Sequence, residues 1–261
     1  QYPVIQNFIS VNSIVDKVSI CIIILSGIIG MGIAELLYLH TLSYVNTNIL
    51  AVIGSTLSIF IFIFSVLFSS IYPYYFPVQK WPPNIFELFG FILIISAIII
   101  SSWNLKNNSK NKTGIFSVLI AILFMGLSAT LTNSVISQVN NNFLSILSII
   151  WIRFIPGIFV SLFFIKINKK VLFSDVISSL SNKTNLFYLT LGSIMFSFLA
   201  VSFMFIGMSF ETNNIAIFSI LAQTSNLIIF LLGWILLKEK INTIKIIGII
   251  ISFLGIILIV V

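Results

Sequence analysis

Hydrophobic residues fill eight long runs along this chain, and short polar links between the runs carry nearly all of the charged residues. A hydrocarbon core about 30 Å thick needs about 20 residues of helix to cross it. Eight runs are long enough: residues 19–43, 49–71, 85–103, 114–136, 143–165, 186–209, 215–237 and 244–261. They lack the alternating polarity of membrane-barrel strands, whereas helices satisfy their backbone groups internally. The pattern predicts an all-α membrane protein, a polytopic helical bundle with eight transmembrane helices.

The composition supports this class and excludes several others. Hydrophobic residues make up 59% of the chain and charged residues 7%, which leaves too little polar surface for a soluble fold. The net charge of +7 comes from lysines spread over short links, a pattern typical of membrane ends, so we expect no nucleic-acid partner. One cysteine and one histidine argue against a metal site. No cofactor-binding motif occurs, and we expect no cofactor.

A short internal similarity indicates a repeat. Residues 43–49 (SYVNTNI) and 209–215 (SFETNNI) lie 166 positions apart and link corresponding pairs of runs. The two copies start five helices apart, and an odd number reverses the direction across the membrane. Opposed units of this kind form the inverted-repeat plan of many secondary transporters. We therefore expect inverted five-helix repeats.

This plan divides the chain into three parts. Residues 1–18 form a polar leader or loop, residues 19–105 the last three helices of a first repeat, and residues 106–261 a complete second repeat. Two helices of the first repeat would then precede Gln1, so we expect this chain to be a piece of a longer protein.

Several segments resemble one transporter family. Residues 236–241 (LLKEKI) and the following span, with Gly248 and Gly255 seven positions apart, resemble the close of an EamA repeat in the drug/metabolite transporter superfamily. Trp151-Ile152-Arg153-Phe154 is similar to the family's arginine–aromatic motif. The first repeat departs from the pattern, with Pro73 in place of the turn glutamate. The resemblance implies a ten-helix metabolite exporter or exchanger, whose substrates range from amino acids to nucleotide derivatives.

Ionisable residues inside the spans are the first candidates for a substrate site, because burying a charge in the bilayer costs about 2.5–3.5 kcal/mol on insertion scales. Arg153 lies near the middle of the fifth span, where its guanidinium would either clamp a carboxylate or phosphate, pair internally, or reach toward the membrane surface. Glu35 in the first span would couple protons or neutralise Arg153. We expect His40 to be an interfacial anchor, with a proton relay as the alternative.

Uncharged polar residues form the second group of candidates. Gln223 and Asn226 share one face of the seventh span, and Asn133 lies with Thr130 and Thr132 in the fourth. These side chains would contact substrate, or they would bond to neighbouring helices. We count Arg153, Glu35, Gln223, Asn226 and Asn133 as the substrate-binding set.

The function that best fits these features is secondary transport. We expect a multi-pass protein, in the cell (plasma) membrane, that moves a small metabolite by alternating access, with a proton or counter-substrate as a further partner. The alternatives are a membrane-embedded enzyme and a channel or non-transporting membrane scaffold. An enzyme would need a nucleophile–base or metal set near one bilayer face, and the lone His40 and lone Cys21 argue against it.

Overall fold

The computed structural model describes residues 17–41, 45, 50, 53–54, 56–74, 76, 84–103, 109–138, 143–167, 181–192, 199–210 and 243–260. Every secondary-structure element within these residues is a helix. In chain order the elements are α2 (Lys17–Ser26), η1 (Gly27–Ala34), α3 (Glu35–Thr41), α5 (Leu57–Ile71), α6 (Ile85–Trp103), α7 (Ser109–Ile136), α8 (Phe143–Ile167), α10 (Lys183–Gly192), α11 (Val201–Phe210) and α13 (Thr243–Val260). The all-helical prediction is confirmed.

The helices follow the hydrophobic runs closely. The third run, residues 85–103, coincides with α6, and the fifth run corresponds to α8. By length and composition, three helices in the described part of the chain can cross a membrane: Lys17–Thr41, Thr113–Ile136 and Phe143–Phe164. Three shorter apolar helices accompany them. The seventh run lies outside the described residues, so the full set of eight spans stays a prediction.

The first span contains a feature that the hydrophobic pattern does not predict. Its middle third, η1, is a π-helix between α2 and α3, in which each hydrogen bond spans one residue more than in an α-helix. The backbone N–H of Glu35 still bonds back to the carbonyl of Gly30, five residues earlier. Such segments are rare and occur often at functional sites. The segment changes which faces of α2 and α3 point into the bundle.

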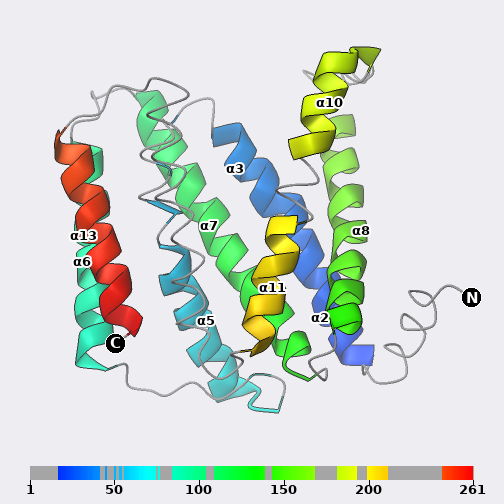
Figure 1. Ribbon diagram of the computed structural model, residues 1–261, viewed down its shortest axis with the longest axis horizontal. Helices are drawn as coiled ribbons and strands as arrows, with labels where there is room; N and C mark the ends of the chain where they lie inside the picture. Colours follow the sequence, from blue (N-terminus) through cyan, green and yellow to red (C-terminus); the bar gives the residue numbers. More distant parts are fainter. Residues whose placement is uncertain are drawn as a thin grey trace, which may run out of the picture.

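The long helix α7 is the hub of the bundle (Figure 1). It packs against the continuous α2–η1–α3 helix, against α5 and against α11, while α8 packs mainly on η1. The helices α6 and α13 form a separate close pair (Figure 1). Because the last helix of the chain packs against the third hydrophobic run, the pair joins segments far apart in the sequence.

The helices α6 and α13 pack closely against each other. The two helices are antiparallel, as the colour gradient of Figure 1 shows. At their contact a Cβ on Gly255 would lie 2.7 Å from the carbonyl oxygen of Gly90 and 3.0 Å from the Cβ of Leu93. Gly255 therefore lets α13 approach the backbone of α6 closely. Superposition of the two repeats stays a prediction.

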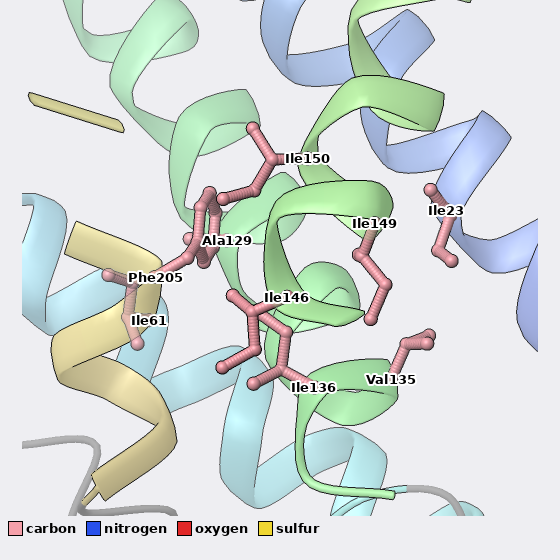
Figure 2. Packing of buried hydrophobic residues seen from close by; sticks show 9 residues of the cluster. All are labelled: Ile23, Ile61, Ala129, Val135, Ile136, Ile146, Ile149, Ile150 and Phe205. Atoms are coloured by element: carbon pink, nitrogen blue, oxygen red, sulfur yellow. The ribbon is translucent and has the colours of Figure 1, made fainter. Parts of the chain in front are cut away.

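A central apolar cluster holds five helices together. Figure 2 shows its nine residues, contributed by α2, α5, α7, α8 and α11: Ile23, Ile61, Ala129, Val135, Ile136, Ile146, Ile149, Ile150 and Phe205. Lipid tails are as apolar as these side chains, so burial alone does not drive such helices together in a bilayer. Close packing and hydrogen bonds between helices must supply the stability.

The outer faces of the helices are apolar as well. Phe159 and Phe163 on α8 are 67% and 65% exposed, and Ile92 on α6 is 61% exposed. A soluble protein rarely leaves so much large apolar surface uncovered. These faces match an integral membrane protein, in which lipid tails cover them.

Candidate functional site

The site is built at the crossing of η1 and α8, where glycines let the two helices approach closely. A side chain on any of these glycines would collide with the opposite helix. A Cβ would lie 2.7 Å from Pro156 Cγ at Gly27, 2.7 Å from Val160 Cβ at Gly32, and 2.6 Å from Met31 Cβ at Gly157. Close approach through small residues is the usual way in which membrane helices associate. It brings the backbone of η1 directly against the helix that carries Arg153.

Arg153 points into the bundle interior. The side chain is only 5% exposed, although the residue lies in the middle of a membrane-spanning helix. Its Nη2 donates a hydrogen bond of 2.7 Å to Ser128 Oγ on α7, and its Cζ lies 4.8 Å from the centroid of the Phe205 ring on α11. Hydrogen bonding and the cation–π contact both stabilise a desolvated guanidinium. The alternative in which Arg153 reaches toward the membrane surface is wrong.

A network of neutral hydroxyl groups supports the guanidinium. Ser128 Oγ accepts from Arg153 and donates to the carbonyl oxygen of Ser26 at 2.7 Å. Thr132 Oγ1 lies 3.1 Å from Ser26 Oγ and can donate to it. Ser26 is the last residue of α2, directly before the π-helical segment. The network therefore ties α2, α7 and α8 together at the point where the first span changes its helical geometry.

Glu35 is near this network without joining it. It is the first residue of α3, it is partly buried, and its charge and that of Arg153 attract each other. Among the described residues, however, no hydrogen bond or ion pair joins Glu35 to Arg153. The closest partners of the guanidinium are a hydroxyl and an aromatic ring. His40, further along α3, is exposed.

Asn133 is the second predicted residue that the structure places in the interior. It is 1% exposed, and neither its Oδ1 nor its Nδ2 has a hydrogen-bond partner in the part of the chain that the structure describes. Its neighbour Thr130 donates to a carbonyl of its own helix, that of Gly126, at 2.9 Å. Thr132 Oγ1 likewise has a partner in its own helix, the carbonyl of Ser128 at 2.9 Å, besides its contact with Ser26 on α2, so helix-to-helix bonding accounts for part of Thr132 and for neither Thr130 nor Asn133. Gln223 and Asn226 lie outside the described residues.

Two parts of the site escaped the sequence analysis. Ser128 is one of many serines, and nothing in its sequence context distinguishes the one that contacts Arg153. The glycines of η1 did carry a signal in their density, since Gly27, Gly30 and Gly32 fall within six residues of one span and small residues are enriched where membrane helices meet.

The comparison with protein families decides the class. The model of the EamA-like transporter family matches residues 112–261. The chain belongs to the EamA-like transporter family. The matched region contains Asn133 and Arg153 but not Glu35, which lies in the first span. A comparison with curated proteins found no match.

Membership of the EamA-like family agrees with the structure described above. The matched region begins near the start of α7 and includes α8, α10, α11 and α13. The EamA-like family consists of membrane transporters, and the apolar outer faces of the helices fit an integral membrane protein. The resemblance noted in the sequence is thereby confirmed.

Proposed function

We propose that this protein is a secondary transporter that moves a small metabolite, such as an amino acid or a nucleotide derivative, across the cell membrane by alternating access. The observation that carries the proposal is Arg153, a charged residue buried in the middle of the bundle with neutral partners. Ionisable groups at this depth are costly and usually mark a pathway for substrate or ions. The inverted-repeat plan supports a site at this depth, because such transporters bind substrate near the midplane.

The residues take different roles in this proposal. Arg153 and Asn133 contact the substrate from α8 and α7. Glu35 takes part from the first span, where it balances the charge of Arg153 and offers a carboxylate for proton or counter-substrate coupling. Gln223 and Asn226 would complete the substrate-binding set from the seventh run. The close crossing of η1 and α8 places the π-helical segment beside Arg153, so a movement of the first span would change the position or the contacts of the guanidinium.

Uptake by proteoliposomes tests the proposal. The full-length chain is reconstituted, a set of labelled metabolites is offered, and accumulation is followed with and without an imposed proton gradient. We expect Arg153→Lys to abolish most uptake while the protein remains folded, because lysine keeps the charge but loses the planar fork. Lys166→Arg, an exchange of the same kind at an exposed position of α8, should keep normal uptake. Normal uptake by Arg153→Lys would remove Arg153 from the substrate site.

A further inference from the structure

Within the described residues, four helices each bury a polar side chain that has an atom without a hydrogen-bond partner. The atoms are Ser65 Oγ on α5, both polar atoms of Asn133 on α7, Arg153 Nε on α8 and Ser202 Oγ on α11. Each of these residues is at most 5% exposed. Buried polar groups in proteins are nearly always bonded, so each exception needs an explanation, such as a bound water or ligand.

The unpartnered serines differ from other buried serines of the same bundle. A serine within a membrane helix normally donates to a carbonyl three or four residues earlier. Ser134 does so with the carbonyl of Leu131 at 2.7 Å, and Ser148 with that of Leu144 at 2.9 Å. Ser65 does not make this bond, although it lies well inside α5, and Ser202, the second residue of α11, has no hydrogen-bond partner either. Their hydroxyl protons are therefore free to donate elsewhere.

The four groups lie on faces that meet at the central apolar cluster. Ser202 is three residues before Phe205, so both side chains share one face of α11, and the guanidinium of Arg153 lies over the Phe205 ring. Phe205 belongs to the cluster shown in Figure 2. This face of α11 is the one that Arg153 meets.

The same spacing places the other two groups. Asn133 is four residues after Ala129 on α7, and Ser65 is four residues after Ile61 on α5. Ala129 and Ile61 also belong to the cluster of Figure 2. Residues four apart lie on one face of a helix, so Asn133 and Ser65 each lie on the side of their own helix that contributes to this cluster.

These groups are complementary to an anion. The Nε of Arg153, the Nδ2 of Asn133 and the two hydroxyls all offer N–H or O–H donors, whereas Asn133 Oδ1 is an acceptor only. The guanidinium carries a full positive charge, and its closest described partners are neutral. Water would satisfy the hydroxyls but would leave the guanidinium without a directly bonded opposite charge, because Glu35 attracts it without contacting it. An oxyanion satisfies both needs, because it accepts several hydrogen bonds and takes the edge of a guanidinium with two parallel bonds.

We propose that Arg153, Asn133, Ser202 and Ser65 bind the oxyanion of the transported molecule, a carboxylate or a phosphate. This inference rests on the proposed transport function and specifies its substrate class as anionic. Arg153 supplies the charge and a donor through its unpartnered Nε, while Ser128 holds the guanidinium in place by a hydrogen bond from Nη2. Ser202 and Asn133 supply donors from the two neighbouring helices.

The test measures binding to the purified full-length protein in a non-ionic detergent, which needs no transport. The unfolding temperature is followed while lactate, inorganic phosphate, lactamide or chloride is added at equal ionic strength. Lactamide matches lactate in shape but lacks its charge. We expect a saturable rise with lactate or with phosphate, and none with lactamide or chloride. The anion that acts identifies the group as carboxylate or phosphate. No rise with either anion, or an equal rise with lactamide, overturns the proposal.

Variants separate binding from folding. Ser202→Ala removes a hydroxyl that has no partner, so the unfolding temperature without anion should stay the same or increase. The apparent Kd for the anion should rise about tenfold, which corresponds to the loss of one hydrogen bond of about 1.4 kcal/mol. Ser134→Ala is the matched control, because this hydroxyl is equally buried and bonds within its own helix. An equal effect of both variants on the Kd refutes the site. If Arg153→Lys fails to fold, the comparison of Ser202→Ala with Ser134→Ala still tests the anion site.

Failure of the anion site and failure of transport give different results. A protein that accumulates only neutral metabolites in proteoliposomes and ignores both anions in detergent keeps the transport function and loses the anion site. A protein that binds an anion with the expected variant effects, yet accumulates nothing, keeps the site and loses the transport function.

Discussion

The contact of η1 with Arg153 leads to a quantitative prediction for Gly30→Ala. A Cβ at Gly30 would overlap Ser128 Oγ and would lie 2.7 Å from both Arg153 Nη2 and Ser128 Cβ. Contacts this short do not occur between real side chains, and the neighbours are a hydroxyl and a guanidinium that hold each other by a hydrogen bond. The new methyl group must therefore push the helices apart or break that bond.

The cost follows from these two effects. Overpacking a dense interior costs typically about 1–3 kcal/mol, and losing a hydrogen bond to a charged group costs about 1.5–3 kcal/mol. We expect Gly30→Ala to lower the free energy of unfolding by about 2.5–6 kcal/mol. The three atoms nearest to a Cβ at Gly32 all belong to the side chain of Val160, the nearest at 2.7 Å. Gly32→Ala should therefore lower the free energy of unfolding by the overpacking cost alone, about 1–3 kcal/mol.

Gly192→Ala completes the series as a control. Nothing lies within 4 Å of a Cβ at Gly192, so this variant should be neutral or slightly more stable. Unfolding in mixed micelles with increasing SDS, followed by fluorescence, ranks the three variants. If Gly30→Ala is no less stable than Gly32→Ala, the predicted loss of the hydrogen bond between Arg153 and Ser128 is refuted. The close crossing itself is refuted if both behave like Gly192→Ala.

Three further predictions concern other contacts. Asn133→Leu removes two buried polar atoms without partners, so the free energy of unfolding in SDS should stay the same or increase by about 1–2 kcal/mol, while metabolite uptake falls. A loss of stability would reveal an internal partner of Asn133. Breaking a direct buried ion pair costs about 3–5 kcal/mol. A double-mutant cycle of Glu35→Gln with Arg153→Gln should give a coupling energy well below that range, and a coupling energy within it would require direct contact between the two side chains. Gly255→Leu should separate α6 from α13, and a cysteine pair placed across these helices should then no longer form a crosslink. Unchanged crosslinking would contradict the tight contact.

The sequence predicted the helices well because the bilayer imposes a simple rule on composition. A span must be apolar over its whole length, so the borders of residues 85–103 are visible as the points where polar residues begin. The π-helical segment was not predictable in this way, because its residues are as apolar as those of the helices on either side. A π-helix differs from an α-helix by a shift of one residue in its backbone hydrogen bonding, and the hydropathy of the residues carries no information on this shift.

The site was predictable only in part for a related reason. Arg153 is visible because a charge in the middle of a span is costly wherever it points. Its partner Ser128 carries no such signal, since serine occurs throughout these helices and the contact depends on how α7 and α8 are rotated. Whether Glu35 meets Arg153 depends on the rotation of α3, which the π-helical segment alters. Charge therefore marks candidates in a sequence, while the pairing among them requires the structure.

The partners of Arg153 also have a consequence for how the protein enters the membrane. A lone arginine at the centre of a helix opposes insertion by about 2.5–3.5 kcal/mol. Ser128 and the backbone of η1, which lie against the guanidinium, both precede α8 along the chain, and among its contacts in the described residues Phe205 is the one that follows α8. During synthesis the helix that carries the charge therefore meets a hydroxyl acceptor that is already in the bilayer, so α8 need not face lipid with Arg153 unpaired.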